Sequence, residues 1–329
     1  MLSKPPKCII PNHNNNPDSP DSYRDRDLRS IIKTIIIICG PTAAGKTALS
    51  IQLANSLQTQ IISADSRQCF KELNIGVAKP SDEELATITH HFINSHSIHD
   101  LVDAGLYEAY ALAAAEKIFE TNDVAVMVGG TGLYIRAFCE GMDDIPAIDL
   151  NIRKQIAADY EQHGMEWLLQ QVAEQDPAFW QQAEQQNPQR LMRGLEVFLS
   201  TGKSIVHFQK GEKKQRPFHI IKTGIELPRE TLYKRINNRV DVMMQNGLIE
   251  EVKNLLPYQQ INALQTVGYK ELFDYFKGHI SLEKAIENIK TNTRHYAKRQ
   301  ITWFKKDPEI IWFAPSTFYL EILRLLKNR

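Results

Sequence analysis

The sequence predicts an α/β protein in which a parallel sheet lies between layers of helices. Short apolar, β-branched runs alternate with helical patterns along the chain, as in doubly wound folds. The run at residues 34–39 leads directly into a glycine-rich turn, which is typical of a strand buried on both faces. A Gln- and Glu-rich stretch after Pro146 interrupts this alternation and predicts an inserted all-helical subdomain.

The core elements follow in order. Strands are expected at residues 34–39, 60–63, 124–128 and 220–226. A helix is expected at 46–57, where Leu49, Leu53 and Leu57 share one stripe, and an alanine-rich helix at 107–120. Further helices are expected at 228–246 and 281–306. The core therefore comprises residues 31–145 and 221–329.

The inserted subdomain is expected at residues 146–220, with helices at 150–163, 165–175 and 188–200. Asn187 before Pro188 is a favourable helix start, and Gly202 a favourable stop. Residues 1–30 are rich in proline and asparagine and lack hydrophobic periodicity, so we expect a disordered tail there.

Composition excludes several classes of protein. The chain has 329 residues, of which 43% are apolar, enough to bury a large core. No apolar run approaches the roughly 18 residues of a membrane span, and no signal peptide is recognisable. The four cysteines include no C-x-x-C pair, which indicates neither a disulfide framework nor a zinc site. We therefore expect a cytoplasmic protein.

Charge is unevenly distributed although the chain is neutral overall. Residues 31–145 contain 7 Lys/Arg and 14 Asp/Glu, whereas residues 229–306 contain 14 and 8, a net charge of +6. This excess suggests a polyanionic partner on the carboxy-terminal side, with solvated helix faces as the alternative. Within it, Lys290, Arg294 and Lys298 form a helical stripe that suits an RNA backbone or solvent equally.

A phosphate-binding loop is the strongest motif. It matches G-x-x-x-x-G-K-[ST] between a predicted strand and a predicted helix, which indicates a P-loop NTPase-like core. Its backbone amides and lysine are expected to bind a di- or triphosphate, and Thr47 to bind a magnesium ion (Mg²⁺). The loop consists of Gly40, Pro41, Thr42, Ala43, Ala44, Gly45, Lys46 and Thr47.

The acidic residue of the site does not stand where a nucleotide hydrolase would have it. The strand at 124–128 is followed by Gly129 and Gly130 rather than by an aspartate. Asp65, just past the second strand, faces the phosphate loop across the carboxyl edge of the sheet. It is therefore a candidate for acid–base chemistry, with a turn-capping role as the alternative.

Seven segments, in order, resemble the bacterial-type tRNA dimethylallyltransferase (tRNA isopentenyltransferase) family, and no zinc finger follows Phe313 as in eukaryotic members. The resemblance covers residues 34 to about 313. The segments are GPTAAGKT at 40–47, ISADSRQ at 62–68, NIGVAKP at 74–80, VGGTGLY at 128–134, NPQRL with RGLEV at 187–197, TVGY at 266–269 and KRQITWF at 298–304.

This resemblance implies a reaction. The loop would bind the pyrophosphate of dimethylallyl pyrophosphate with Mg²⁺, and the acceptor would be the N6 amine of the adenine 3′ of the anticodon (A37) in tRNAs that read codons beginning with U. It implies Asp65 as general base, Thr131 as an RNA contact beside the reacting base, and Arg229 and Arg235 as pyrophosphate ligands. The expected product is N6-dimethylallyladenosine.

The resemblance also implies that the inserted subdomain grips the anticodon stem-loop and that the enzyme is a monomer. The implied tRNA contacts are Asp65, Ser66, Arg67, Gln68, Thr131, Arg153, Gln189, Arg190, Leu191, Met192, Arg193, Thr266, Gly268, Tyr269 and Arg299.

Two other functions remain open from the residues alone: a small-molecule kinase that uses ATP on the same loop, and a non-catalytic RNA-binding module, against which intact Lys46, Thr47 and Asp65 argue. The histidines at 90, 91, 96 and 99 suggest a surface loop, with metal binding as the less favoured reading.

Overall fold

The computed structural model describes residues 32–327, and all elements below belong to one compact unit. The tail expected at residues 1–30 lies outside the described residues. Within residues 32–327, no helix has both the length and the apolar character that crossing a membrane requires.

The strands form one six-stranded, fully parallel sheet in the order β3-β2-β4-β1-β5-β6. Its central strand, β1 (Thr34–Cys39), pairs along its whole length with β4 (Val124–Gly129) and β5 (His219–Ile225). The outer strands are β2 (Ile61–Ala64), β3 (His90–His91) and β6 (Ile311–Phe313). The predicted strands are confirmed with shifts of about one residue, and their carboxyl ends share one edge of the sheet.

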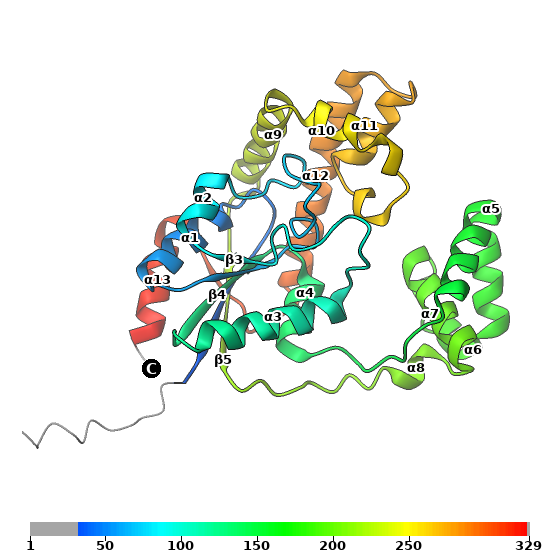
Figure 1. The fold of residues 1–329 in the computed structure, drawn as a ribbon, viewed down its shortest axis with the longest axis horizontal. Helices are drawn as coiled ribbons and strands as arrows, with labels where there is room; N and C mark the ends of the chain where they lie inside the picture. The colour runs from blue at the N-terminus through cyan, green and yellow to red at the C-terminus, as the bar shows by residue number, and fades with distance from the viewer. Residues whose placement is uncertain (1–31, 328–329) are drawn as a thin grey trace, which may run out of the picture. The chain divides into compact units, whose positions relative to one another are not determined.

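Different helices cover the two faces of this sheet (Figure 1). Ile35 and Ile37 belong to one apolar cluster, and Ile36 and Ile38 to the other, because side chains alternate along a strand. The first cluster includes α3 (Ala104–Phe119) and α4 (Gly132–Glu140), the second α1 (Lys46–Ser56) and α13 (Pro315–Lys327). All four isoleucines are fully buried, as predicted for a doubly covered strand.

Between α4 and β5 the chain forms only helices, with an apolar cluster of their own. Gly164 divides α5 (Leu150–Gln175) with φ 72°, at the break predicted between two helices. α6 (Pro177–Trp180) and α8 (Ile205–Phe208) are short. α7 (Pro188–Thr201) starts and stops as predicted: the Asn187 side chain accepts from the Arg190 amide, and Gly202 is left-handed.

The carboxy-terminal part contributes helices to the same edge of the sheet. α9 (Arg229–Gln245) and α12 (Leu282–Phe304) match the predicted helices, and α12 packs against both α9 and α11 (Tyr269–Phe276). α10 (Leu248–Asn254) and two 3-10 turns, Leu256–Tyr258 and Asn262–Leu264, lie between α9 and α11 in the chain.

The histidine segment is not simply a surface loop, so that expectation was wrong for its first half. α2 (Asp82–Thr87) precedes β3, in which His90 and His91 pair with β2. His91 Nε2 lies 2.7 Å from Gln60 Oε1, and His90 Nδ1 lies 2.8 Å from the Ile88 carbonyl. Burial lowers the pKa of both imidazoles. These histidines are occupied by edge-strand contacts.

Candidate active site

The phosphate loop joins the end of β1 to the start of α1. Gly40 has φ 141° and passes so close to β5 that a Cβ there would lie 3.3 Å from the Ile225 carbonyl oxygen. Gly45 has φ 92°, and Ala43 has φ 63°, a conformation that residues with a side chain rarely adopt. The N-terminus of α1 has no side-chain cap. The loop therefore keeps its backbone amides free for an anion.

Lys46 is the first residue of α1 and its ammonium group is turned back onto the loop. Its Nζ donates to the Pro41 carbonyl over 2.7 Å. Burial lowers the pKa of Lys46 to about 8, and the negative charge of Asp65 acts in the opposite direction. An anion that enters the loop offers this cation a stronger partner than a carbonyl does.

A cavity of about 360 Å³, which we call the loop cavity, opens directly on the phosphate loop. Lys46, Lys79, Arg235 and Arg239 line it, against two carboxylates, Asp65 and Glu84. The excess of cations matches a ligand that carries several negative charges.

Two arginines of α9 hold the loop from the side. Arg235 Nη1 donates to the Ala44 carbonyl over 3.3 Å, and Arg239 Nη2 donates to Thr42 Oγ1. Arg239 Nε is buried and has no hydrogen-bond partner within residues 32–327. A buried donor without a partner is costly, so a ligand oxygen at this position would satisfy it.

A second cavity of about 550 Å³ adjoins the loop cavity. It is lined by the turn after β2, by α9, by α11 with the preceding residues, and by α12. The residues that line both cavities are Thr42, Asp65, Val77, Arg239 and Tyr296. Two ligands, one in each cavity, would therefore meet beside the Asp65 carboxylate.

Asp65 follows β2 and uses its two carboxylate oxygens differently. Oδ1 accepts from the backbone amides of Arg67 at 2.9 Å and Gln68 at 3.3 Å, so Asp65 does cap the turn. Oδ2 has no hydrogen-bond partner among the described residues. The capping and acid–base readings of Asp65 are therefore compatible, since one oxygen fixes the carboxylate and the other is available to a ligand.

Tyr296 on α12 faces Asp65 at the junction of the cavities. Burial and the Asp65 charge raise the pKa of Tyr296 to about 12, so it is a neutral hydroxyl at pH 7. Its hydroxyl hydrogen-bonds the Thr131 side chain. Thr131 Oγ1 also accepts from the Ser66 amide at 3.0 Å and contacts Ser66 Oγ at 3.3 Å. Thr131 thus braces the Asp65 turn from behind and is not among the residues that line either cavity.

Gln300 on α12 explains the glycines after β4. Its Oε1 accepts from the Thr42 amide and its Nε2 donates to the Gly130 carbonyl, both over 2.8 Å. A Cβ on Gly130 would lie 2.2 Å from Gln300 Nε2, and one on Gly129 would lie 2.1 Å from the Ala64 carbonyl oxygen. Close packing between strand ends and α12 therefore occupies the position where an aspartate was considered.

Arg229 is not where the sequence reading expected it, because it does not line the loop cavity. It is exposed at the start of α9, 5.1 Å from the Tyr233 ring, and lines a separate cavity. Arg235 and Arg239 are four residues apart and share a helix face, whereas Arg229 precedes Arg235 by six residues, about 240° around the helix. This i, i+4 spacing is the signal that could have identified Arg239, which the sequence reading missed.

The expected tRNA contacts in the core are divided between the two cavities and the interior. Gln68 lines the loop cavity and its Nε2 donates to the Val77 and Ala78 carbonyls. Four others line the second cavity: Ser66, Arg67, Thr266 and Gly268, together with Arg299 from α12.

Tyr269 is fully buried, so its expected tRNA contact is corrected to a structural one. Its hydroxyl donates to Glu251 Oε1 at 2.5 Å, and the same carboxylate accepts from the amides of Ile75 at 2.7 Å and Gly76 at 3.0 Å. Glu251, which the sequence reading also missed, thus fastens the 74–80 loop to α10 and α11.

In the helical subdomain the expected contacts differ in availability. Leu191 is fully buried in the subdomain cluster, so a direct contact by its side chain is corrected to core packing. Arg153 and Arg193 pair with Glu196 over 3.2 and 3.5 Å. Gln189 and Arg190 are exposed, although Arg190 lies 3.4 Å from Glu184; Met192 is half-buried.

A magnesium ion is compatible with the loop cavity. Thr47 and Asp65, both oxygen donors, line it, and oxygen is the donor that Mg²⁺ prefers. Within residues 32–327 no group of three or more His, Cys, Asp or Glu side chains is arranged to hold a metal by itself. The donor set therefore fits a magnesium ion shared with ligand phosphates and water.

Comparison with known proteins identifies similar chains. A family model described as IPP transferase matches residues 68–307. A tRNA dimethylallyltransferase of Christiangramia forsetii is 50% identical over 279 residues, 85% of this chain and 92% of the relative. That of Flavobacterium johnsoniae is 46% identical over 301 residues, 90% and 97% of the two chains.

Solved structures agree in fold. The full-length tRNA isopentenylpyrophosphate transferase of Bacillus halodurans has a TM-score of 0.66 and 32% identity, covering 90% of this chain and 96% of that one. A eukaryotic dimethylallyltransferase, captured acting on tRNA, has a TM-score of 0.70 and 27% identity, covering 87% and 75%.

Proposed function

The chain belongs to the IPP transferase family, and from this we propose that it transfers a dimethylallyl group from dimethylallyl pyrophosphate to tRNA. The acceptor is the N6 amine of A37, the adenine 3′ of the anticodon, in tRNAs that read codons beginning with U. The products are N6-dimethylallyladenosine and pyrophosphate. The observation that carries this proposal is the junction of two cavities beside Asp65.

The loop cavity suits the prenyl donor because the reaction needs a stabilised pyrophosphate leaving group. Negative charge grows on the pyrophosphate as its bond to the allylic carbon breaks. The loop amides, Lys46, Arg235 and Arg239 are arranged to receive that charge, and Arg239 has an unpaired Nε to offer. Lys46 would exchange the Pro41 carbonyl for a phosphate oxygen.

A magnesium ion held by Thr47 and the donor phosphates would supply further charge neutralisation. Its binding by this chain is part of the proposal.

The second cavity suits an adenine turned out of an RNA loop, as enzymes that modify bases require. The adenine amine is a weak nucleophile because its lone pair is delocalised into the ring. Asp65 Oδ2 would accept the amine proton as the carbon–nitrogen bond forms. Tyr296, a neutral hydroxyl at the same junction, would orient the reacting groups. Arg67 and Arg299 line this cavity and would hold the RNA backbone.

The helical subdomain, residues 146–220, would grip the anticodon stem-loop through exposed Gln189 and Arg190, with Arg153 and Arg193 exchanging Glu196 for phosphates. We expect the enzyme to work as a monomer and in the cytoplasm, where its tRNA substrate is.

Transfer can be tested directly by incubating the protein with unmodified total tRNA, dimethylallyl pyrophosphate and Mg²⁺, and analysing the nucleosides by mass spectrometry. Dimethylallyladenosine should form, pyrophosphate should be released in equal amount, and ATP should not be required. ATP consumption with no prenylated nucleoside would instead support a kinase on the same loop.

A further inference from the structure

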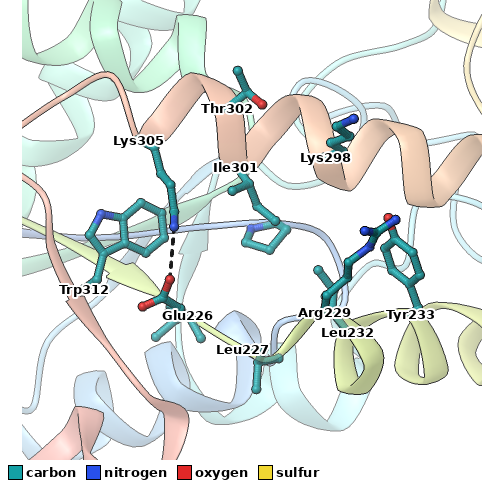
Figure 2. A pocket seen from close by; sticks show the side chains of 12 residues that line it. Glu226, Leu227, Arg229, Leu232, Tyr233, Lys298, Ile301, Thr302, Lys305 and Trp312 are labelled. Carbon is teal, nitrogen blue, oxygen red and sulfur yellow. Dashed lines mark hydrogen bonds and ion pairs between the residues drawn. The ribbon is translucent and has the colours of Figure 1, made fainter.

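We propose a second ligand site, for an aliphatic isoprenoid diphosphate, in the cavity between α9 and α12 on the other side of Pro41 from the loop cavity. The cavity has a volume of about 340 Å³, near the lower end of the roughly 300–1,000 Å³ typical of ligand pockets. Figure 2 shows it bounded by α12, the start of α9, the end of β5 and Trp312. The proposed transfer reaction does not use this site.

The charge of this α9–α12 cavity selects an anion. Three cations, Arg229, Lys298 and Lys305, line it together with one carboxylate, Glu226. Lys305 Nζ lies 3.1 Å from Glu226 Oε1, as the dashed line in Figure 2 marks, so this pair is neutral as a unit. Arg229 and Lys298 have no carboxylate partner anywhere in residues 32–327. Two cations are therefore available to one ligand.

The walls of the cavity select an aliphatic body. Ile225, Leu227, Leu232 and Ile301 form much of the lining, and Leu232 and Ile225 are almost fully buried. A ligand that covered these side chains would gain from removing apolar surface from water.

The aromatic rings of the cavity are already engaged, which argues against a stacked nucleobase. Arg229 lies 5.1 Å and Arg294 5.9 Å from the Tyr233 ring centroid. The Trp312 ring has Lys305 at 5.9 Å and packs against Gly224. A short aliphatic chain with a diphosphate at the cationic rim therefore fits better than a nucleotide.

The position of the cavity gives an occupant access to the phosphate loop. Pro41 lines the cavity, and the Pro41 carbonyl is the acceptor for Lys46 Nζ. Lys298 is also two residues from Gln300, which holds the Thr42 amide. A ligand here would touch the loop without entering the loop cavity.

The test is binding stoichiometry without tRNA, so that no donor is consumed. We expect calorimetry or equilibrium dialysis with dimethylallyl pyrophosphate or geranyl diphosphate to give two sites per chain in the native protein. Lys46→Ala should weaken the loop site and leave the other intact. Arg229→Glu with Lys298→Glu should weaken the second site by at least about tenfold, the loss expected for a charged hydrogen bond.

Two further variants keep the test decisive. Thr302→Trp, at an exposed lining position, should fill the cavity and leave one site without changing its charge. Lys306→Glu is the matched control, since it reverses a charge on the residues just after α12 without lining this cavity, and should retain two sites.

Stronger binding of geranyl diphosphate at the second site would identify a longer isoprenoid as its occupant, and stronger binding of dimethylallyl pyrophosphate a second donor molecule. A single site in the native protein that Lys46→Ala removes would overturn the proposal, even if tRNA transfer is normal. Equal binding of inorganic pyrophosphate at the second site would overturn it too, as would a single native site combined with weaker tRNA binding by the Arg229 and Lys298 variant.

Discussion

At the scale of single residues, Asp65 shows how one side chain can serve both structure and chemistry. Its Oδ1 is held by two backbone amides, and its Oδ2 remains open toward the junction of the cavities. A general base benefits from such fixation, because the unpaired oxygen then points in one direction without further loss of side-chain entropy. The two roles can be separated by a substitution that keeps the cap.

Asp65→Asn should keep the cap and remove the proton acceptor. We expect the single-turnover rate of prenyl transfer to fall by about 10²–10⁴, the usual contribution of a general base, while the melting temperature and both substrate affinities change little. Asp103→Asn is the control: its Oδ1 caps α3 by accepting from the Leu106 amide, and asparagine caps equally well. An Asp65→Asn rate within about threefold of the parent would remove Asp65 from catalysis.

Lys46 gives a pH dependence to donor binding. Burial lowers its pKa to about 8, so the ammonium is charged below that pH and is lost as the pH rises through it. Donor affinity should therefore decline between pH 7.5 and 9.5, a range in which a phosphate group, with its last pKa near about 6, no longer changes charge. Arginine stays protonated, so Lys46→Arg should bind with a flat profile. Equal slopes in the two proteins would assign the titration to another group.

At the scale of elements, α12 connects the two ends of the site. Its Tyr296 lies at the junction of the cavities, Arg299 lines the second cavity, and Gln300 bridges the phosphate loop to Gly130. The helix thus couples the position of the phosphate loop to the surface proposed for RNA.

Gln300→Leu keeps the approximate size of the side chain and removes both hydrogen bonds, which leaves the Thr42 amide and the Gly130 carbonyl without their partner. We expect a loss of stability of about 1–3 kcal/mol for such unpaired groups, and weaker donor binding because the loop is less well held. Thermal unfolding and donor titration would measure the two effects. Unchanged donor affinity in a folded variant would show that the loop keeps its shape without α12.

At the scale of the whole molecule, the basic carboxy-terminal third divides into structural and available cations. Lys290 Nζ lies 2.5 Å from Asp241 Oδ1, and Arg294 Nη1 donates to Asn237 Oδ1 over 2.7 Å, so both join α12 to α9. The predicted stripe is therefore only partly open to RNA. Arg299 and Lys306 are exposed and form no ion pair among the described residues.

Salt dependence of tRNA binding should follow this division. Removal of one cation that neutralises an RNA phosphate reduces the slope of log affinity against log salt by about 0.7–0.9. Replacing Arg299 and Lys306 together by alanine should thus lower the slope by one to two such steps, whereas Lys290→Ala should leave it nearly unchanged. Filter binding across a salt series would measure it. A larger effect from Lys290 than from the exposed pair would reverse the assignment.

The sequence by itself determined the features that depend on contiguous residues. The phosphate loop, the central strand, the break at Gly164 and the ends of α7 were predicted correctly, because local sterics and backbone hydrogen bonds decide them. The family resemblance added Asp65 at the cavity junction, while the short β3, β6 and α4 were missed.

Only the tertiary structure decided which distant side chains meet at that loop. Gln300 contacts Thr42 across 258 positions of sequence, Arg239 contacts it across 197, and Glu251 reaches Ile75 across 176. It also removed Arg229 from the loop cavity and placed Tyr269 and Leu191 in the interior. The physical reason is that a cavity is formed by the helix faces that pack around it, and packing depends on the whole set of apolar contacts rather than on any one segment.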